Sequence, residues 1–200
     1  MKSFTSILRK SLIAECEIKA QNESTIFIIK NSQNEGDLKE VRLDAKRDDN
    51  SFFIFTFDKR EIQKLHNTDL ITIDWIKKRS DCIVYKYKNS QHYFIIIEVK
   101  SNKAGGAKNQ LNSMEAFLHY LMKAIQINYE SIKNLNNVRV ARLLITSRAL
   151  FKPFVKTKSL EQLVPFNPSI NANEIQYRKD EKKAIPIELF MKCKFKGIYK

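Results

Sequence analysis

Residues 81–110 read DCIVYKYKNSQHYFIIIEVKSNKAGGAKNQ. Two segments, 82–88 and 92–100, are rich in Ile, Val, Phe and Tyr, and the polar residues 89–91 separate them. Two such segments joined by a short polar break predict a β-hairpin. The second segment is apolar at every position from 94 to 97, so we expect a central strand that is covered on both faces.

The length of the hairpin turn decides which side chains meet at the end of this hairpin. Side chains alternate along a strand, so Glu98 and Lys100 share one face and Val99 takes the other. A two-residue turn at 89–90 would place Asp81 opposite Glu98, with Cβ atoms about 5 Å apart. A three-residue loop would place Asp81 opposite Val99, on the wrong face, unless a bulge corrects the register. The first register gathers two carboxylates and one amine at one edge of the sheet.

Such a cluster suits metal-assisted phosphate chemistry. Mg²⁺ prefers oxygen ligands and is often held by one or two carboxylates together with water and substrate phosphate. Mn²⁺ is the alternative cation. The amine of Lys100 would orient the attacking water or neutralise charge that builds on the phosphorane. The competing interpretation is that Glu98 and Lys100 form the solvated end of a strand.

The same residues resemble the core motif of a nuclease superfamily. Asp81 followed by Glu98-Val99-Lys100 is similar to the motif of the PD-(D/E)xK nucleases, which include restriction endonucleases, RecB-type nuclease domains and Holliday-junction resolvases. Gln110 resembles a glutamine that follows in RecB-like members. The chain departs from the pattern at Met114, where those members often have tyrosine, and at Ser80, which stands in place of the proline.

The resemblance implies roles for these residues. Asp81 and Glu98 would bind the metal together with the main-chain carbonyl of Val99, and Lys100 and Gln110 would complete the catalytic set. In many of these nucleases a glutamate on the first helix reaches the metal. We expect a first helix over 3–20, where apolar residues recur at helical spacing, and there the candidate is Glu15, with Glu17 second. An exposed helix acid is the alternative for both.

The rest of the chain predicts a single domain of α/β class, spanning residues 1–200. The order of elements predicts a mixed β-sheet flanked by helices, with a loop-rich, basic C-terminal portion, 151–200, and the resemblance implies that this fold is restriction-endonuclease-like. The expected strands are 25–30, 38–45, 51–57 and 138–146, the last beside the Glu98 strand, and the long helix is 109–128. Segment 60–66 predicts a short helix, and 69–76 a strand that carries the spare acid Asp74. Segment 159–185 is expected to be loop-rich, and 185–200 an edge strand or a basic tail.

The formal net charge of +14 favours a polyanionic partner, through steering and counterion release. The alternative is a solvated basic surface, since the bias towards Lys, Asn and Ile indicates an AT-rich genome. The candidate contacts to nucleic acid are Lys77, Lys78, Arg79, Lys103, Lys108, Arg148 and Lys152. DNA is the expected partner and RNA stays open, as do a homodimer and a larger complex.

Other classes of protein find little support. Cys16, Cys82 and Cys193 offer neither a disulfide framework nor zinc spacing. The sequence contains no apolar run long enough for a membrane helix and no apolar leader, so we expect a cytoplasmic protein without membrane association. The predicted function is a metal-dependent nuclease, for example in restriction, phage defence or repair. The alternatives are a non-catalytic nucleic-acid-binding subunit on the same scaffold and an interaction domain whose charge only solubilises it.

Overall fold

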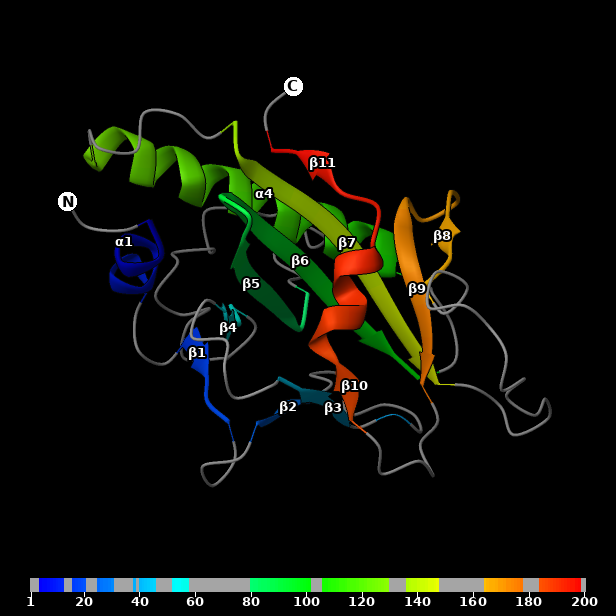
Figure 1. The fold of residues 1–200 in the computed structure, drawn as a ribbon. Helices are drawn as coiled ribbons and strands as arrows, with labels where there is room; N and C mark the ends of the chain where they lie inside the picture. The colour runs from blue at the N-terminus through cyan, green and yellow to red at the C-terminus, as the bar shows by residue number, and fades with distance from the viewer. Residues whose placement is uncertain are drawn as a thin grey trace, which may run out of the picture.

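A computed structural model of the protein describes residues 4–12, 16–20, 25–30, 38, 40–45, 52–57, 80–101, 106–129, 136–147, 164–177 and 184–198. Within these residues the strands form an eight-stranded mixed sheet and a three-stranded sheet. Helices flank the larger sheet (Figure 1). The predicted α/β class is therefore confirmed at this level.

The predicted hairpin is present, and its turn has two residues. Strand β5 (Cys82–Lys88) pairs antiparallel with β6 (Gln91–Lys100), beginning with Lys88 opposite Gln91. The turn residues Asn89 and Ser90 have φ values of 49° and 60°. Positive φ at both central positions is typical of a type I′ turn, whose twist matches that of the strands on either side. The alternative three-residue loop is excluded.

The larger sheet is ordered around β6. Its strands run β1-β4-β5-β6-β7-β9-β8, and β11 also pairs with β7. The bounds are β1 Glu17–Ile18, β4 Phe52–Phe55, β7 Val138–Ser147, β8 Phe166–Asn167, β9 Ala172–Tyr177 and β11 Lys196–Gly197. β6 lies between the antiparallel β5 and the parallel β7, so both predictions for this strand, its central position and its neighbour, are confirmed.

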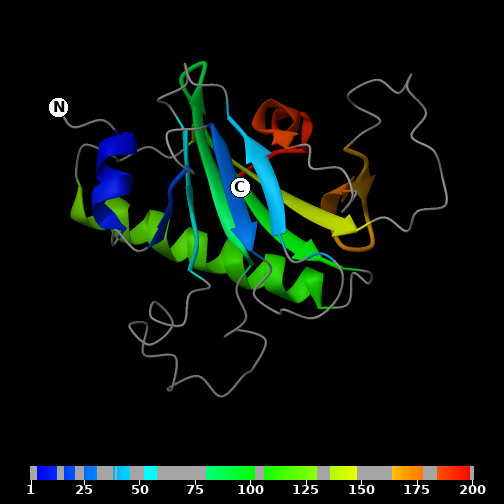
Figure 2. The same cartoon turned by 90° about the horizontal axis from the view of Figure 1, so that it is seen from below.

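Each face of the sheet is covered by a separate apolar cluster. On one face Phe94 and Ile96 of β6 pack with residues of helices α1 (Phe4–Ser11) and α4 (Ala107–Asn128). On the opposite face Ile95 and Ile97 pack against three further elements (Figure 2). These are β2 (Ile26–Lys30), β3 (Glu40–Asp44) and the 3₁₀ helix η5 (Ile187–Lys192). β10 (Ile185–Pro186) extends the small sheet by pairing with β3. The alternation of side chains along β6 thus supplies both layers of the core.

The structure corrects two expectations. The predicted helix over 3–20 ends at Ser11, and Glu17 lies in β1. The N–H of Thr56 donates to the carbonyl of Cys16 at 2.8 Å, so backbone pairing with the β4 segment replaces helical hydrogen bonds here. The segment expected to be loop-rich contains β8 and β9, which join the larger sheet.

One further expectation, for the C-terminal stretch, is confirmed, and those for segments 60–66 and 69–76 stay predictions. The basic C-terminal stretch forms an edge pairing through β11, as one of its two interpretations predicted. Segments 60–66 and 69–76, with Asp74, lie outside the described residues. No helix in the described part of the chain has the length and apolar character needed to cross a membrane.

Candidate active site

Asp81 lies against the end of β6, where the hairpin register places it. Cys82 pairs with Ile97, and one more step along this register sets Asp81 opposite Glu98. The main-chain N–H of Val99 donates a hydrogen bond of 2.7 Å to Oδ2 of Asp81. The exposed fraction is 6% for Asp81 and 1% for Glu98. The structure therefore joins an acid to the strand end that carries the second acid, although the two are far apart in sequence.

Glu98 and Lys100 share one face of β6, as strand alternation predicts. Both follow Phe94 and Ile96 in the alternation, so they belong to the face that α4 covers. Nζ of Lys100 lies 2.9 Å from Oε1 of Glu98, and their side chains are 8% and 1% exposed. The interpretation of this pair as a solvated strand end is therefore wrong. A buried ion pair is stable only when its geometry offsets the cost of removing both charges from water.

The pKa of the Cys82 thiol depends on its burial and on two nearby carboxylates. Burial raises the pKa of Cys82 well above its usual value, and the negative charges of Asp81 and Glu98 raise it further. Both carboxylates are therefore near the same sulfur.

The start of α4 contributes Gln110 to the same side of the sheet. Gln110 is buried, and its N–H donates to the carbonyl of Gly106 at 3.1 Å. Gly106 precedes the helix with φ of 77°, a conformation that favours glycine. Lys108, in the first turn, is exposed to solvent. Gln110 thus lies beneath the helix start, whereas Lys108 faces outward.

Several predicted residues lie outside the described part of the chain: Glu15, Lys77, Lys78, Arg79, Lys103, Arg148 and Lys152. Glu17 is described, and its carboxylate lies 3.1 Å from Arg9 in a half-exposed ion pair. The structure therefore assigns Glu17 to a pair between α1 and β1. The residues that it brings together at one strand end are Asp81, Glu98, Val99 and Lys100.

The oxygen donors at this strand end fit a hard divalent cation. Two carboxylates and the carbonyl of the intervening main chain are ligands of the kind that Mg²⁺ takes, with water and phosphate filling the remaining positions. Among the described residues, no group of three or more His, Cys, Asp or Glu side chains gathers as a metal site.

Polar residues that the sequence analysis did not select lie on the neighbouring strands. Lys100 pairs with Thr146 of β7, whose Oγ1 donates to Oε1 of Glu174 on β9 at 3.3 Å. By alternation with Ala172, Glu174 faces the side of α4. Residues 174–177 alternate polar and apolar, which is a short strand signal, but the surrounding Pro and Asn residues favoured a loop.

A second missed cluster lies under α4. Glu115 interrupts the apolar stripe of the helix and is buried. It binds Arg142 of β7 and, at 2.5 Å, Nζ of Lys196 of β11. An acid inside an apolar helical stripe signals a buried ion pair, but the sequence does not identify its partners.

Comparison of the chain with family models, with curated protein sequences and with solved structures finds no match.

Proposed function

We propose that this protein is a metal-dependent phosphodiesterase of the restriction-endonuclease-like type that hydrolyses nucleic acid. The observation that carries the proposal is the junction of Asp81 with Glu98-Val99-Lys100. One carboxylate binds the main chain of the strand end, and the other pairs with the amine two residues along. This residue set suits phosphate hydrolysis with a divalent cation.

Each residue has a distinct task in this proposal. Asp81 and Glu98 would hold Mg²⁺ or Mn²⁺ with the carbonyl of Val99. The cation, when bound, polarises the phosphate and lowers the pKa of a water ligand. Lys100, already positioned by Glu98, would orient that water and stabilise charge on the phosphate. Gln110 would position substrate from the start of α4.

The charge of the chain supports a nucleic-acid substrate. A formal net charge of +14 attracts polyanions and concentrates them at the surface. DNA is the proposed substrate, with RNA as the second arm of the test. Restriction, phage defence and repair are the settings in which such an activity is used.

A cleavage assay tests the proposal. Supercoiled DNA, linear DNA and RNA are each incubated with the protein in Mg²⁺, in Mn²⁺ and in EDTA. Cleavage by the wild type should require a metal. Asp81→Asn and Lys100→Met should each reduce the rate by about 10²-fold or more, while a thermal melt checks that each variant is folded.

The control variant is Lys88→Ala, which removes an exposed lysine from the same hairpin. It should cleave like the wild type. Cleavage that persists in Asp81→Asn would exclude this site. Binding of nucleic acid without cleavage under every condition would assign the protein to the non-catalytic alternative.

A further inference from the structure

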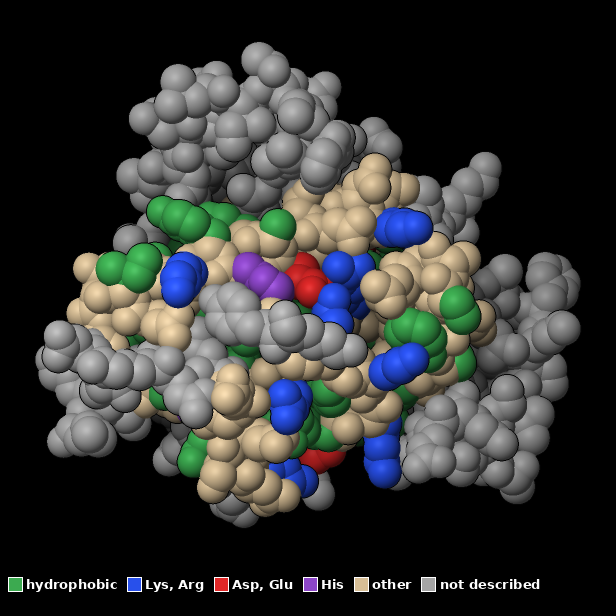
Figure 3. All heavy atoms as spheres, turned by 90° about the horizontal axis from the view of Figure 1, so that it is seen from above, with side chains coloured by type: hydrophobic (Ala, Val, Ile, Leu, Met, Phe, Trp, Pro, Cys, Tyr) green, Lys and Arg blue, Asp and Glu red, His purple; other side chains and the backbone are tan. Residues whose placement is uncertain are grey.

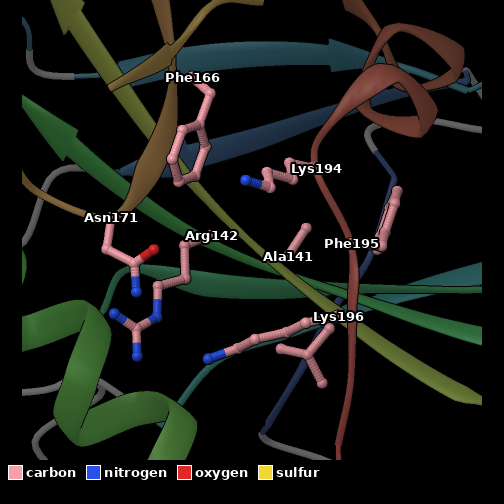
Figure 4. Close-up of a pocket in the computed structure, with 8 residues that line it drawn as sticks. Ala141, Arg142, Phe166, Asn171, Lys194, Phe195 and Lys196 are labelled. Atoms are coloured by element: carbon pink, nitrogen blue, oxygen red, sulfur yellow. The ribbon is translucent and has the colours of Figure 1, made fainter. Parts of the chain in front are cut away.

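The outer edge of β7 is shared by two strands that leave a hollow between them. β11 pairs with its first half, with Lys196 opposite Val140, and β9 pairs with its second half from Leu143 onward. The hollow lies at this junction and has a volume of about 90 Å³ (Figure 4). It is lined by Val140, Ala141, Arg142, Phe166, Asn171, Lys194, Phe195 and Lys196.

Positive charge dominates the hollow, and part of it is held in a fixed position. Nε of Arg142 and Nζ of Lys196 both bind the carboxylate of Glu115. Arg142 also donates to Oδ1 of Asn112 at 2.5 Å. Among the described residues that line the hollow, Arg142, Lys194 and Lys196 are cations and none is an acid. Figure 3 shows acidic, basic and histidine side chains side by side on the face seen from above.

The carboxylate in this cluster stays ionised at neutral pH. Burial alone would raise the pKa of Glu115, but the hydrogen bond from Lys196 and the charge of Arg142 outweigh it, so this pKa is lowered. Arg142 is thereby kept in one orientation. A preorganised guanidinium binds an anion at a lower entropic cost than a mobile side chain does.

Lys194 is the cation of the hollow that is available to a ligand. Its Nζ lies 4.6 Å from the centre of the Phe166 ring, and its main-chain N–H donates to Oδ1 of Asn173 at 2.8 Å. In the described part of the chain, it makes no ion pair. In Figure 4 the side chains of Lys194 and Lys196 point to the same side of the chain, and Phe195 lies on the other.

We propose that this hollow binds a backbone phosphate of a nucleic-acid strand, with Phe166 against the adjoining sugar or base. The volume suits one phosphate-sized group rather than a whole nucleotide. Cations beside an aromatic ring are typical of single-strand binding surfaces, and here Lys194 lies beside the half-buried ring of Phe166. The inference goes beyond the proposed function, because binding here requires neither a metal nor cleavage.

The position of the hollow suits a strand that also reaches the candidate active site. Arg142 pairs with Ile96, two residues before Glu98, and Lys196 is one strand further out. Strand spacing and rise then place Lys194 about 12 Å from Glu98 between Cα atoms. Arg142 and Lys196 lie on the α4 side, as Glu98 does. A strand of several nucleotides spans this distance on one face.

Binding in EDTA tests the inference independently of catalysis. The affinity of a labelled single-stranded oligonucleotide of about 16 nucleotides is measured by fluorescence anisotropy over a series of NaCl concentrations. Lys194→Ala should weaken binding about five-fold and reduce the slope of log K against log salt by about 0.7. Lys194→Arg should keep the affinity within about two-fold of the wild type, because the charge is retained. Lys88→Ala, an exposed lysine on β5, is the matched control and should change neither quantity.

Competition separates the sources of the anion. Unlabelled oligonucleotide should displace the probe far better than inorganic phosphate or a mononucleotide does, and better than polyglutamate of equal charge. Equal effects of Lys194→Ala and Lys88→Ala, no binding by the wild type, or equal displacement by polyglutamate or a mononucleotide would each overturn the inference. A failed cleavage assay does not affect the binding result, and a failed binding assay does not affect the cleavage result.

Discussion

Replacing Lys100 by methionine should destabilise the protein strongly when no metal is present. Lys100 and Glu98 are buried, and their charged atoms are 2.9 Å apart. At an effective dielectric constant of about 20, two unit charges at this distance attract with about 6 kcal/mol. Part of this attraction offsets desolvation, so removing one partner of a buried pair costs about 3–5 kcal/mol. We expect that loss in the free energy of unfolding of Lys100→Met.

The assay is a double-mutant cycle measured by urea denaturation at neutral pH. The variants are Lys100→Met, Glu98→Gln and the pair of changes together. The double variant leaves neither charge of the pair, so its cost should be about 2–3 kcal/mol less than the sum of the single costs. The exposed pair Arg42 and Glu40, at 3.4 Å with side chains 40% and 46% exposed, is the control. Its coupling energy should stay below about 1 kcal/mol.

The change in unfolding free energy on adding Mg²⁺ is a second test of the same site. The proposed function predicts that Mg²⁺ at ten times its Kd restores about 1.4 kcal/mol in Lys100→Met, because a ligand that binds only the folded state stabilises it. The same addition to Asp81→Asn should restore much less. A cost below about 1 kcal/mol for Lys100→Met, with no coupling to Glu98, would refute the reasoning. It would mean that the pair is solvated and that the strand end is not a low-dielectric site.

Two other predictions concern the hairpin and acid stability. Ser90→Gly should raise the free energy of unfolding by about 0.5–1 kcal/mol, because Ser90 has φ of 60°, which glycine adopts without strain. Calorimetry should show a higher Tm. An unchanged or lower Tm would contradict the observed turn. Burial lowers the pKa of His92 from 6.5 to about 4, so the stability gained by keeping it neutral is present above pH 6.5 and lost as the pH falls toward 4. The full effect is about 3 kcal/mol. His92→Gln should flatten this part of the stability profile in urea titrations, and an equally steep decline in the variant would assign the acid sensitivity to other groups.

The hairpin is the part of the fold that could be read from sequence, and its local physics explains why. Alternation along a strand depends on backbone geometry alone, so the shared face of Glu98 and Lys100 follows without knowledge of the rest of the chain. The turn length stayed open between two and three residues. The structure decided it, because Lys88 pairs with Gln91 and Asn89 and Ser90 both have positive φ.

The C-terminal part of the first predicted helix and the segment of β9 were assigned wrongly for a common reason. Segment 16–18 pairs with β4, and segment 172–177 pairs with β7. Both pairings use backbone groups of strands that are distant in sequence. Local propensity does not include hydrogen bonds to strands that are distant in sequence. From local sequence alone, a helix for the first segment and a loop for the second were therefore the favoured predictions.

The amino-acid sequence by itself determined the hairpin, the two apolar faces of β6 and the shared face of Glu98 and Lys100. Only the tertiary structure decided that Glu98 and Lys100 are buried and that Lys196 joins Glu115 beside the edge of β7. Periodicity and turn geometry act between neighbours along the chain. Burial and ion pairing depend on which distant segments exclude water from a charge, and those segments meet only in the folded protein.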